Sequence, residues 1–542
     1  MKKLKGNIVD VVNRKIFKGE ITIESGIITN IRECETDKNQ YIIPGFVDAH
    51  VHVESSMLIP SEFARLAVCH GSVGTISDPH EIGNVLGKEG VKFMINNGLR
   101  TPFKFHFGAP SCVPATIFET AGAEITLQDI AEIFELPRVN YLAEMMNFPG
   151  VLNRDPEVMA KINLAIEKGK QVDGHAPGLM GEDAKRYIEA GITTDHECFT
   201  KTEALNKLEY GMKIIIREGS AAKNFEALWT LIDEHPESVM LCSDDKHPND
   251  LAVGHINVLA KRAIAKGCEL FNVLRAASYN TIKHYRMDVG LLQENDPADF
   301  CIVKDLTNFE VTATYIDGQL VAENGQTLID SVEEIPVNNF GCSEINKEQL
   351  IVKAESSDVN VICVEDGQLI TTREIAKLTE VNGTLQPDVS RDVLKIVVVN
   401  RYFDAAPAIG FVKNFGLKHG GIASCVAHDS HNIIAVGTND DDICEAVNAI
   451  IREKGGVSLA NGKELLTVAL PVAGIMSHLD GYEIADAYEK LDIRAKELGA
   501  TLAAPYMTLS FCALLVIPKL KLSDLGLFDG DTFSFTKLYA ED

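Results

Sequence analysis

Short apolar runs alternate with amphipathic segments between residues 41 and 250 of the chain. Runs of this length predict buried strands, and apolar residues recurring every three to four positions predict helices. Near-continuous apolar strands separated by helices imply parallel pairing, and eight such units over about 200 residues predict a (β/α)8 barrel. The runs cover residues 41–53, 73–79, 103–111, 139–148, 170–178, 191–199, 211–220 and 238–245, with helical patterns at 127–136, 156–169 and 181–191.

Two other regions flank the predicted barrel. Residues 1–40 and 296–325 both consist of short strand patterns separated by turn signals, so we expect one composite β domain from 1–43 plus 296–335. The barrel would then span 44–295. A C-terminal α/β domain is expected over 340–542, with strand patterns at 393–401 and 431–437 and a helical pattern at 441–455. The predicted fold class is therefore α/β, with a small β domain and a C-terminal domain added to the barrel.

Composition and charge narrow the classes of partner. The 542 residues include 51 Lys and Arg against 78 Asp and Glu, a formal net charge of -27. Such a surface repels nucleic acid and anionic membranes, so we expect a small-molecule substrate and no nucleic acid or membrane partner. The N-terminus has no apolar signal region, the longest apolar stretch is too short to span a bilayer, and no two of the twelve cysteines form a Cys-x-x-Cys pair. A cytoplasmic protein with reduced cysteines, assembled as a homodimer, is the expectation.

Polar side chains with metal-ligand chemistry follow the predicted strands. In this type of barrel the active site lies at the C-terminal ends of the strands. Imidazoles and carboxylates together suit divalent zinc, manganese or iron, and six ligands exceed the needs of one catalytic ion, so two ions bridged by a carboxylate and a hydroxide fit better. The candidates are His50, His52, Glu144, His175, His196 and Asp244.

Alternatives stand beside these assignments. A single buried histidine is more often a hydrogen-bonded core residue than a ligand. The pairing of His50 with His52 on one strand face favours the ligand interpretation, and six such groups, each at the end of a predicted barrel strand, favour it further. Asp48 is better explained as structural. Asp245 is the rival of Asp244, because a shift of register by one residue changes which of the two faces inward.

The strand-one His-x-His motif, preceded by Pro-Gly-Phe-Val-Asp, resembles the amidohydrolase superfamily. A longer ordered set of motifs, from residue 44 to beyond 510, resembles the bacterial-type adenine deaminases within that superfamily. These motifs include "PGFVDAHVHVESSML", "SDPHEIGNVLG", "AEMMNFPGV", "DGHAPGL", "DHEC", "SDDKHP", "GGIASCVAHDSHNIIAVG" and "PYMTLSF".

The resemblance implies a metal-dependent hydrolase barrel and a role for each candidate ligand. His50 and His52 would hold one ion with Asp244, His175 and His196 would hold a second, and Glu144 would bridge the two. Manganese or iron is implied, with zinc as a further candidate. Residues 139–148 contain no lysine, which separates this chain from the dihydropyrimidinase and urease branch, where a carboxylated lysine bridges the metals.

The implied reaction is hydrolysis of adenine to hypoxanthine and ammonia in purine salvage, by a hydroxide that bridges the metals. Asp244 and Glu144 are the catalytic candidates, with Asp244 carrying a proton to the leaving ammonia. Glu81, Ser55 and Asp195 are candidates for binding the purine. Glu81 and Ser55 each have a structural alternative, since a glutamate can cap a helix and a serine can satisfy backbone groups at a strand end.

Two questions stay open at the level of sequence. The segment 427–432, with two histidines three residues apart, either folds over the barrel mouth or forms a structural turn. The same barrel could also carry another cyclic-amide hydrolase or aminohydrolase activity, or serve as a binding protein without catalysis, because a fold alone does not fix function.

Overall fold

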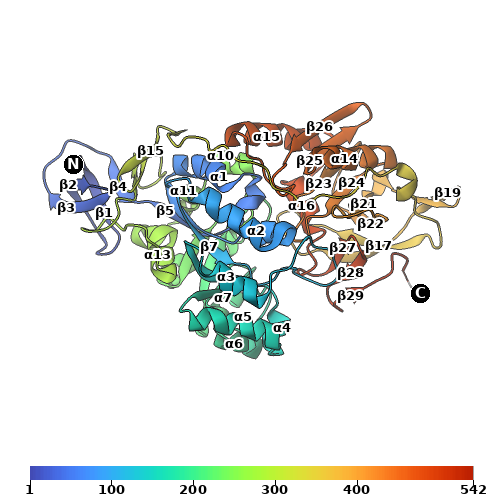
Figure 1. Ribbon diagram of the computed structural model, residues 1–542, viewed down its shortest axis with the longest axis horizontal. Coiled ribbons are helices and arrows are strands. Elements are labelled where there is room, and N and C mark those ends of the chain that lie inside the picture. The colour runs from blue at the N-terminus through green and yellow to red at the C-terminus, as the bar shows by residue number, and fades with distance from the viewer. Residues whose placement is uncertain (541–542) are drawn as a thin grey trace.

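Eight parallel strands form the centre of the protein, which we describe from a computed structural model covering residues 1–540. They alternate with helices along the chain, as the apolar pattern predicts (Figure 1). The strands are β5 (Phe46–Val51), β6 (Ser72–Ser77), β7 (Lys104–Ala109), β8 (Val139–Met145), β9 (Gln171–Gly174), β10 (Thr194–Asp195), β11 (Lys213–Arg217) and β12 (Val239–Cys242).

Hydrogen bonds close these strands into a ring. Strands β5 to β9 pair in order, and so do β10 to β12. The Thr193 amide donates to the Val172 carbonyl at 2.9 Å, which joins the two sets. At the other side the Asp244 amide donates to the His50 carbonyl at 2.9 Å, which brings the end of β12 beside β5. The predicted (β/α)8 barrel is therefore confirmed.

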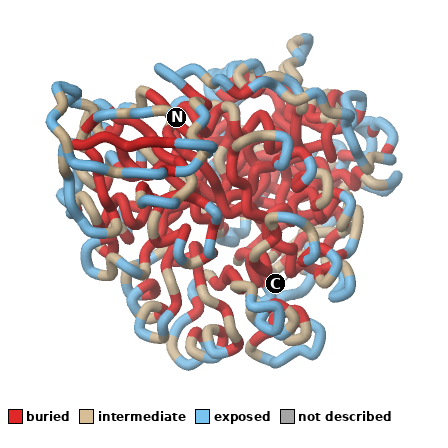
Figure 2. The backbone as a smooth tube through the Cα atoms, turned by 60° about the vertical axis from the view of Figure 1, so that its left-hand side comes forward, coloured by how far each residue is buried: buried red, intermediate tan, exposed pale blue. Residues whose placement is uncertain are grey.

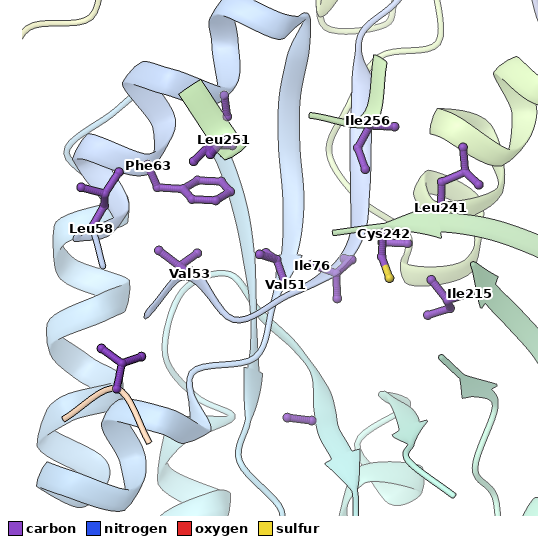
Figure 3. Close-up of a cluster of buried hydrophobic side chains, with 14 of the residues drawn as sticks. Val51, Val53, Leu58, Phe63, Ile76, Ile215, Leu241, Cys242, Leu251 and Ile256 are labelled. Atoms are coloured by element: carbon purple, nitrogen blue, oxygen red, sulfur yellow. The ribbon is translucent and has the colours of Figure 1, made fainter. Parts of the chain in front are cut away.

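Helices cover the outside of the barrel and seal its apolar core. The start of α5 shows how the local sequence defines one of them, since the Asp155 side chain accepts the Glu157 and Val158 amides and Pro156 occupies the first turn. Figure 3 shows Val51 and Ile76 of two barrel strands in one apolar cluster with Phe63 and Leu251 of the outer helices. The helices are α1 (Pro60–Ala67), α2 (His80–Gly98), α3 (Leu127–Ile133), α4 (Phe148–Leu152), α5 (Pro156–Glu167), α6 (Gly181–Glu189), α7 (Lys201–Glu209), α8 (Phe225–Leu228), α9 (Leu231–Glu234), α10 (Pro248–Val253), α11 (Ile256–Ala265), α12 (Leu270–Leu274) and α13 (Asn280–Tyr285).

Strands from both sides of the barrel in sequence build one eight-stranded sheet. Strand β4 pairs with β1 on one side and with β13 on the other, so the N-terminal segment and residues 300–327 share a ladder. The buried Lys104 attaches this sheet to the barrel, with Nζ 2.8 Å from Asp299 Oδ2 and 2.9 Å from Asp317 Oδ1. The strands are β1 (Lys2–Asp10), β2 (Lys15–Glu24), β3 (Ile27–Glu33), β4 (Tyr41–Pro44), β13 (Phe300–Val303), β14 (Val311–Ile316), β15 (Gln319–Glu323) and β16 (Gln326–Thr327).

A second eight-stranded sheet forms the C-terminal region, on the side of the barrel away from the N-terminus (Figure 1). The strand and helix patterns predicted at 393–401, 431–437 and 441–455 are confirmed as β21, β24 and α14. The elements are β17 (Asp358–Cys363), β18 (Thr372–Lys377), β21 (Val393–Val399), β22 (Ala408–Lys413), β23 (Gly421–Ser424), β24 (Ile433–Gly437), β25 (Gly456–Asn461), β26 (Glu464–Ala469), α14 (Asp440–Glu453), α15 (Gly481–Glu497) and α16 (Pro505–Phe511), with the short strands β19 (Thr379–Val381), β20 (Thr384–Gln386), β27 (Leu520–Ser523), β28 (Gly526–Asp529) and β29 (Ser534–Phe535) beside them.

The C-terminal region packs directly on the barrel. The Ser477 amide donates to the Met57 carbonyl at 2.7 Å, and the Ile59 amide donates to the Ser477 carbonyl at 3.1 Å. The hydroxyl of Tyr488 in α15 lies 2.7 Å from His247 Nδ1 at the start of α10. Buried chain continues through the interior of the molecule, with exposed segments at its edge (Figure 2). No helix within residues 1–540 is long and apolar enough to cross a membrane.

Candidate metal centre

Six side chains predicted as metal ligands meet at the C-terminal ends of the barrel strands. Each projects from the end of a strand or from the residue or two that follow it, where the backbone leaves the barrel wall. All six are at most 6% exposed. They are His50 and His52 from β5, Glu144 from β8, His175 after β9, His196 after β10 and Asp244 after β12.

His50, His52 and Asp244 form one set of donors. His50 Nε2 and His52 Nε2 lie 3.3 Å apart, and each lies 3.3 Å from Asp244 Oδ1. Ligand atoms bonded to a tetrahedral ion at about 2.0–2.1 Å are separated by about 3.4 Å, because of the tetrahedral angle. The three atoms therefore have the spacing of ligands around one ion.

His175, His196 and Glu144 form the second set. Glu144 Oε2 lies 2.8 Å from His175 Nδ1 and 3.2 Å from His196 Nε2. The other carboxylate oxygen, Oε1, lies 3.5 Å from His52 Nε2 of the first set. Glu144 thus presents one oxygen to each group of imidazoles, which is the geometry of a bridging carboxylate.

The donor sets fit metal ions better than a hydrogen-bonded core. Asp244 Oδ1 and His175 Nε2 are buried and have no hydrogen-bond partner within residues 1–540. A buried acceptor without a partner costs about 1–3 kcal/mol. The Asp244 oxygen beside the two imidazoles therefore requires a partner other than a hydrogen-bond donor, and a metal cation is such a partner. Buried imidazole and carboxylate groups at this spacing form a metal-binding cluster.

Asp244 and Asp245 both line the pocket at the barrel mouth. The sequence suggests that strand register decides which of them faces inward, but in the structure both do. Strand β12 ends at Cys242, and Asp244 has a left-handed backbone with φ of 52°. Strict alternation stops there, because such a residue leaves the extended conformation. Asp244 faces His50 and His52, whereas Asp245 Oδ1 accepts the Ser55 hydroxyl at 2.6 Å.

Arg217, at the end of β11, sets the charge of Asp244. Its guanidinium contacts Glu197 directly and donates from Nη1 to Asp244 Oδ2 at 3.0 Å. Burial by itself raises the pKa of Asp244, but Arg217 and the imidazoles of His50 and His52 together hold that pKa well below its ordinary value. Asp244 is therefore held as a carboxylate beside both imidazoles.

The three purine-binding candidates occupy different positions. Glu81 lines the pocket, and its two oxygens contact His428 and His431. Ser55 reaches the pocket only through its bond to Asp245. Asp195 turns away, since its carboxylate contacts Lys207 and accepts the Glu197 amide at 2.8 Å.

Several pocket residues escaped the sequence interpretation. His80 Nδ1 lies 3.5 Å from Glu144 Oε1, and Asp78 Oδ2 accepts the Glu144 amide at 3.2 Å. Both belong to the "SDPHE" segment after β6, where a histidine and an aspartate at a strand end were the available signal. Others that escaped it include Glu197 and Arg217 in the barrel, and Leu369 and Leu514 from the C-terminal region, whereas His428 and Asp429 belong to the segment 427–432 that the sequence left open.

Comparison with known proteins gives two family matches that divide the chain. Residues 41–321 match the amidohydrolase family, and residues 368–534 match the adenine deaminase C-terminal domain. The chain is 54% identical to an adenine deaminase of Sulfurovum sp. over 534 residues, which covers 98% of this chain and 99% of that protein. It is 50% identical to the adenine deaminase of Methanosarcina mazei over 556 residues, with 100% of each covered, and 51% identical to that of Salinibacter ruber over 539 residues, with 99% and 98% covered.

Proposed function

The chain belongs to the adenine deaminases of the amidohydrolase family, and we propose that its buried cluster catalyses hydrolysis of adenine to hypoxanthine and ammonia. The observation that carries this proposal is the pair of donor sets that share Glu144 at the barrel mouth. A deaminase must activate water next to an aromatic carbon, and a carboxylate between two groups of imidazoles is suited to that chemistry.

We propose that the protein uses two divalent ions, manganese or iron first and zinc as an alternative. His50, His52 and Asp244 would hold one ion, His175 and His196 would hold the other, and Glu144 would contact both. When bound, such a pair supplies a hydroxide nucleophile at neutral pH, because it lowers the pKa of water from about 15.7 towards 7. Arg217 donates to Asp244 Oδ2, and the Asp78 carboxylate accepts the Glu144 backbone amide, so these two residues keep Asp244 and Glu144 in place.

Asp244 is the proposed proton carrier. Water that adds at C6 of the purine contributes two protons. One ends on N1 of the hypoxanthine, and the Asp244 carboxylate would accept the other and pass it to the amino group, so that the C6–N bond breaks as ammonia leaves. The bond from Arg217 to Asp244 Oδ2 fixes the orientation of this carboxylate during the transfer. Barrel walls and C-terminal side chains enclose the reacting atoms, which excludes bulk water from the site.

Purified protein tests the proposal directly. Protein prepared with a chelator and then supplied with Mn²⁺ should release ammonia and hypoxanthine from adenine in equal amounts, with about two metal ions bound per chain. If about two metal ions bind per chain but adenine releases no ammonia, the proposed metal centre is supported and adenine as the substrate is refuted. Sedimentation of the same sample tests the proposed homodimer.

A further inference from the structure

A loop of the C-terminal region enters the pocket at the barrel mouth. It joins β23 to β24 and carries His428 and Asp429, both buried and both part of the pocket wall that includes Glu144 and Asp244. Asp429 Oδ1 lies 3.4 Å from His80 Nε2 of the barrel. The segment left open by the sequence therefore folds over the barrel mouth.

Glu81 fixes the ring of His428. Its Oε1 contacts His428 Nδ1, and its Oε2 lies 2.5 Å from His431 Nε2, so both oxygens of one barrel carboxylate hold the C-terminal loop. A carboxylate bonded to Nδ1 makes that nitrogen the proton donor and determines which ring edge points away from it. Phe511 packs beside the same imidazole, with ring centroids 5.5 Å apart and planes tilted by 32°.

The remaining ring nitrogen of His428 is free to bind a ligand. Nε2 makes no hydrogen bond within the part of the chain that the structure describes; it faces Asp245 Oδ1 at 3.7 Å, which is within ion-pair range but longer than a hydrogen bond. The imidazole is thus buried at the pocket with Nδ1 held by Glu81 and with Nε2 in no hydrogen bond. A core histidine would normally have both nitrogens satisfied.

We propose that His428 reads a nitrogen of the five-membered ring of the purine, N7 or N9, through Nε2, and that Glu81 is its positioning residue. This inference rests on the proposed deamination of adenine. With C6 at the metal donors, the pocket must recognise the purine at atoms away from the reacting carbon. An imidazole with a fixed ring edge offers one directed bond for that task, and Glu81, with both oxygens in use, acts through it.

Analogue binding in matched variants tests this assignment. We would measure KM and kcat for adenine, and competitive inhibition constants for 7-deazaadenine and 9-deazaadenine, in wild type and in His428→Ala and His428→Gln. A directed bond to a buried ring nitrogen is worth about 1.5–3 kcal/mol, which corresponds to about 10- to 100-fold in affinity. In 9-deazaadenine the ring proton lies on N7, so the wild type should lose that factor with both analogues if His428 donates to N7, and with 9-deazaadenine alone if His428 accepts from N9–H.

In His428→Ala each affected analogue should bind within about 3-fold of adenine, because the partner of the missing nitrogen is gone. KM for adenine should rise by about 10- to 100-fold, and kcat should change less. His428→Gln, which keeps a polar group, should recover part of the loss. Ser430→Ala is the matched control, because it alters the same loop, where Ser430 Oγ accepts the Asn432 side-chain amide at 3.2 Å, without lining the pocket or contacting the Glu81 carboxylate, so its analogue ratios should equal those of wild type.

Metal content and thermal unfolding of every variant separate recognition from folding. Unchanged analogue ratios in both His428 variants would overturn the inference, and so would loss of a bound metal ion, which would assign His428 to metal binding. If His428→Ala does not fold, the ratios of analogue affinity to adenine affinity in His428→Gln test the inference instead. Absence of ammonia from adenine in the wild type would refute the proposed function as well, whereas an active wild type with unchanged ratios would refute only the role of His428.

Discussion

His50 and His52 converge on a single oxygen of Asp244, with all three donor atoms 3.3 Å apart. Replacing both histidines by alanine removes two neutral nitrogen ligands from one side of the centre. We expect loss of about one metal ion per chain and nearly all deaminase activity, with the fold retained. Elemental analysis and ammonia release measure the two effects.

The second donor set provides the internal control for that variant. His175 and His196 contact Glu144 Oε2, and that carboxylate stays in the variant although His196 loses the stacked His50 ring, so one ion should remain. A double variant that keeps two ions and the wild-type rate would show that the first set is not a metal site.

The Asp244→Asn variant removes the negative charge of this side chain and keeps its shape. The amide is nearly isosteric but is a poor proton acceptor and a weak metal ligand, so both proposed roles suffer. General acid–base groups contribute typically about 10²- to 10⁴-fold, and we expect kcat to fall by at least that factor. Steady-state kinetics with adenine, combined with metal analysis, measures the loss.

Asp245→Asn is the neighbouring comparison. Asp245 lines the pocket, but its Oδ1 binds Ser55 rather than the imidazoles of the first set. The Asp245→Asn variant should therefore show a smaller fall in kcat than the Asp244→Asn variant. The reverse ranking would transfer the proton-carrying role to Asp245.

At the scale of elements, strand β10 and helix α7 are joined by a buried ion cluster. Lys207 Nζ contacts Asp195 and lies 2.8 Å from Glu203 Oε1 and 2.7 Å from the Ala176 carbonyl. Lys207→Met leaves two buried carboxylates without their cation, and breaking a buried pair costs about 3–5 kcal/mol. Chemical denaturation should show a loss of that order in the free energy of unfolding.

Lys201→Met on the same helix is the matched control. Lys201 Nζ lies 2.6 Å from Glu234 Oε1, but both side chains are about 40% exposed, at 38% and 43%. Exposed pairs contribute about 0–1 kcal/mol, so this variant should unfold almost like wild type. Equal losses in the two variants would contradict a stabilising role for the buried cluster.

The junction of α10 with α15 should weaken in acid. Burial lowers the pKa of His247 to about 3, although Asp250 raises it and His428 lowers it further. The unfolded chain binds a proton below about pH 6.5 and the folded imidazole does not, so stability is complete above that pH and is lost as pH falls towards 3. Between pH 7.5 and 5 the loss should be on the order of 2 kcal/mol.

Thermal unfolding at several pH values measures this dependence. His247→Gln can still accept the Tyr488 hydroxyl but cannot titrate, so its melting temperature should fall less between pH 7.5 and 5. Parallel pH profiles in the two proteins would show that His247 is not the group responsible.

Sequence periodicity predicts the elements well and their ends less well. Apolar runs such as 139–145 are unambiguous because a strand buried on both faces admits few polar residues, and Glu144 stands out there for that reason. Alternation fails after Cys242, where the left-handed backbone at Asp244 lets two successive aspartates face one pocket. No local pattern records that Glu81 meets His428, since 347 residues separate them.

At the scale of the whole molecule, the C-terminal region is part of the pocket and not an appendage. Leu369, His428 and Leu514 contribute to the wall that also holds the barrel ligands. The C-terminal region packs on the barrel through α15 and the segment around Ser477. A barrel without this region would leave the metal donors open to solvent, and the two regions therefore act as one catalytic unit.

This enclosure predicts that the substrate is the free base. A ribose attached at N9 would have to pass between barrel and C-terminal side chains that already pack at the mouth, such as His80 with Asp429. A site that binds a ring N–H by a buried hydrogen bond can reject an analogue lacking it by about 10⁴-fold or more. The net charge of -27 also disfavours a phosphate-bearing nucleotide, because like charges repel at the entrance.

We therefore expect ammonia release from adenine and little from adenosine or AMP at the same concentration. Coupled assays with all three compounds measure kcat/KM, and hypoxanthine formed from adenine in the same preparation proves that the enzyme is loaded and active. Raising the ionic strength should reduce any repulsion of AMP but should not improve adenosine, which carries no charge, so the two causes of rejection can be told apart. Comparable kcat/KM values for adenine and adenosine would show that the C-terminal wall does not limit substrate size, and would leave the metal donor sets unaffected.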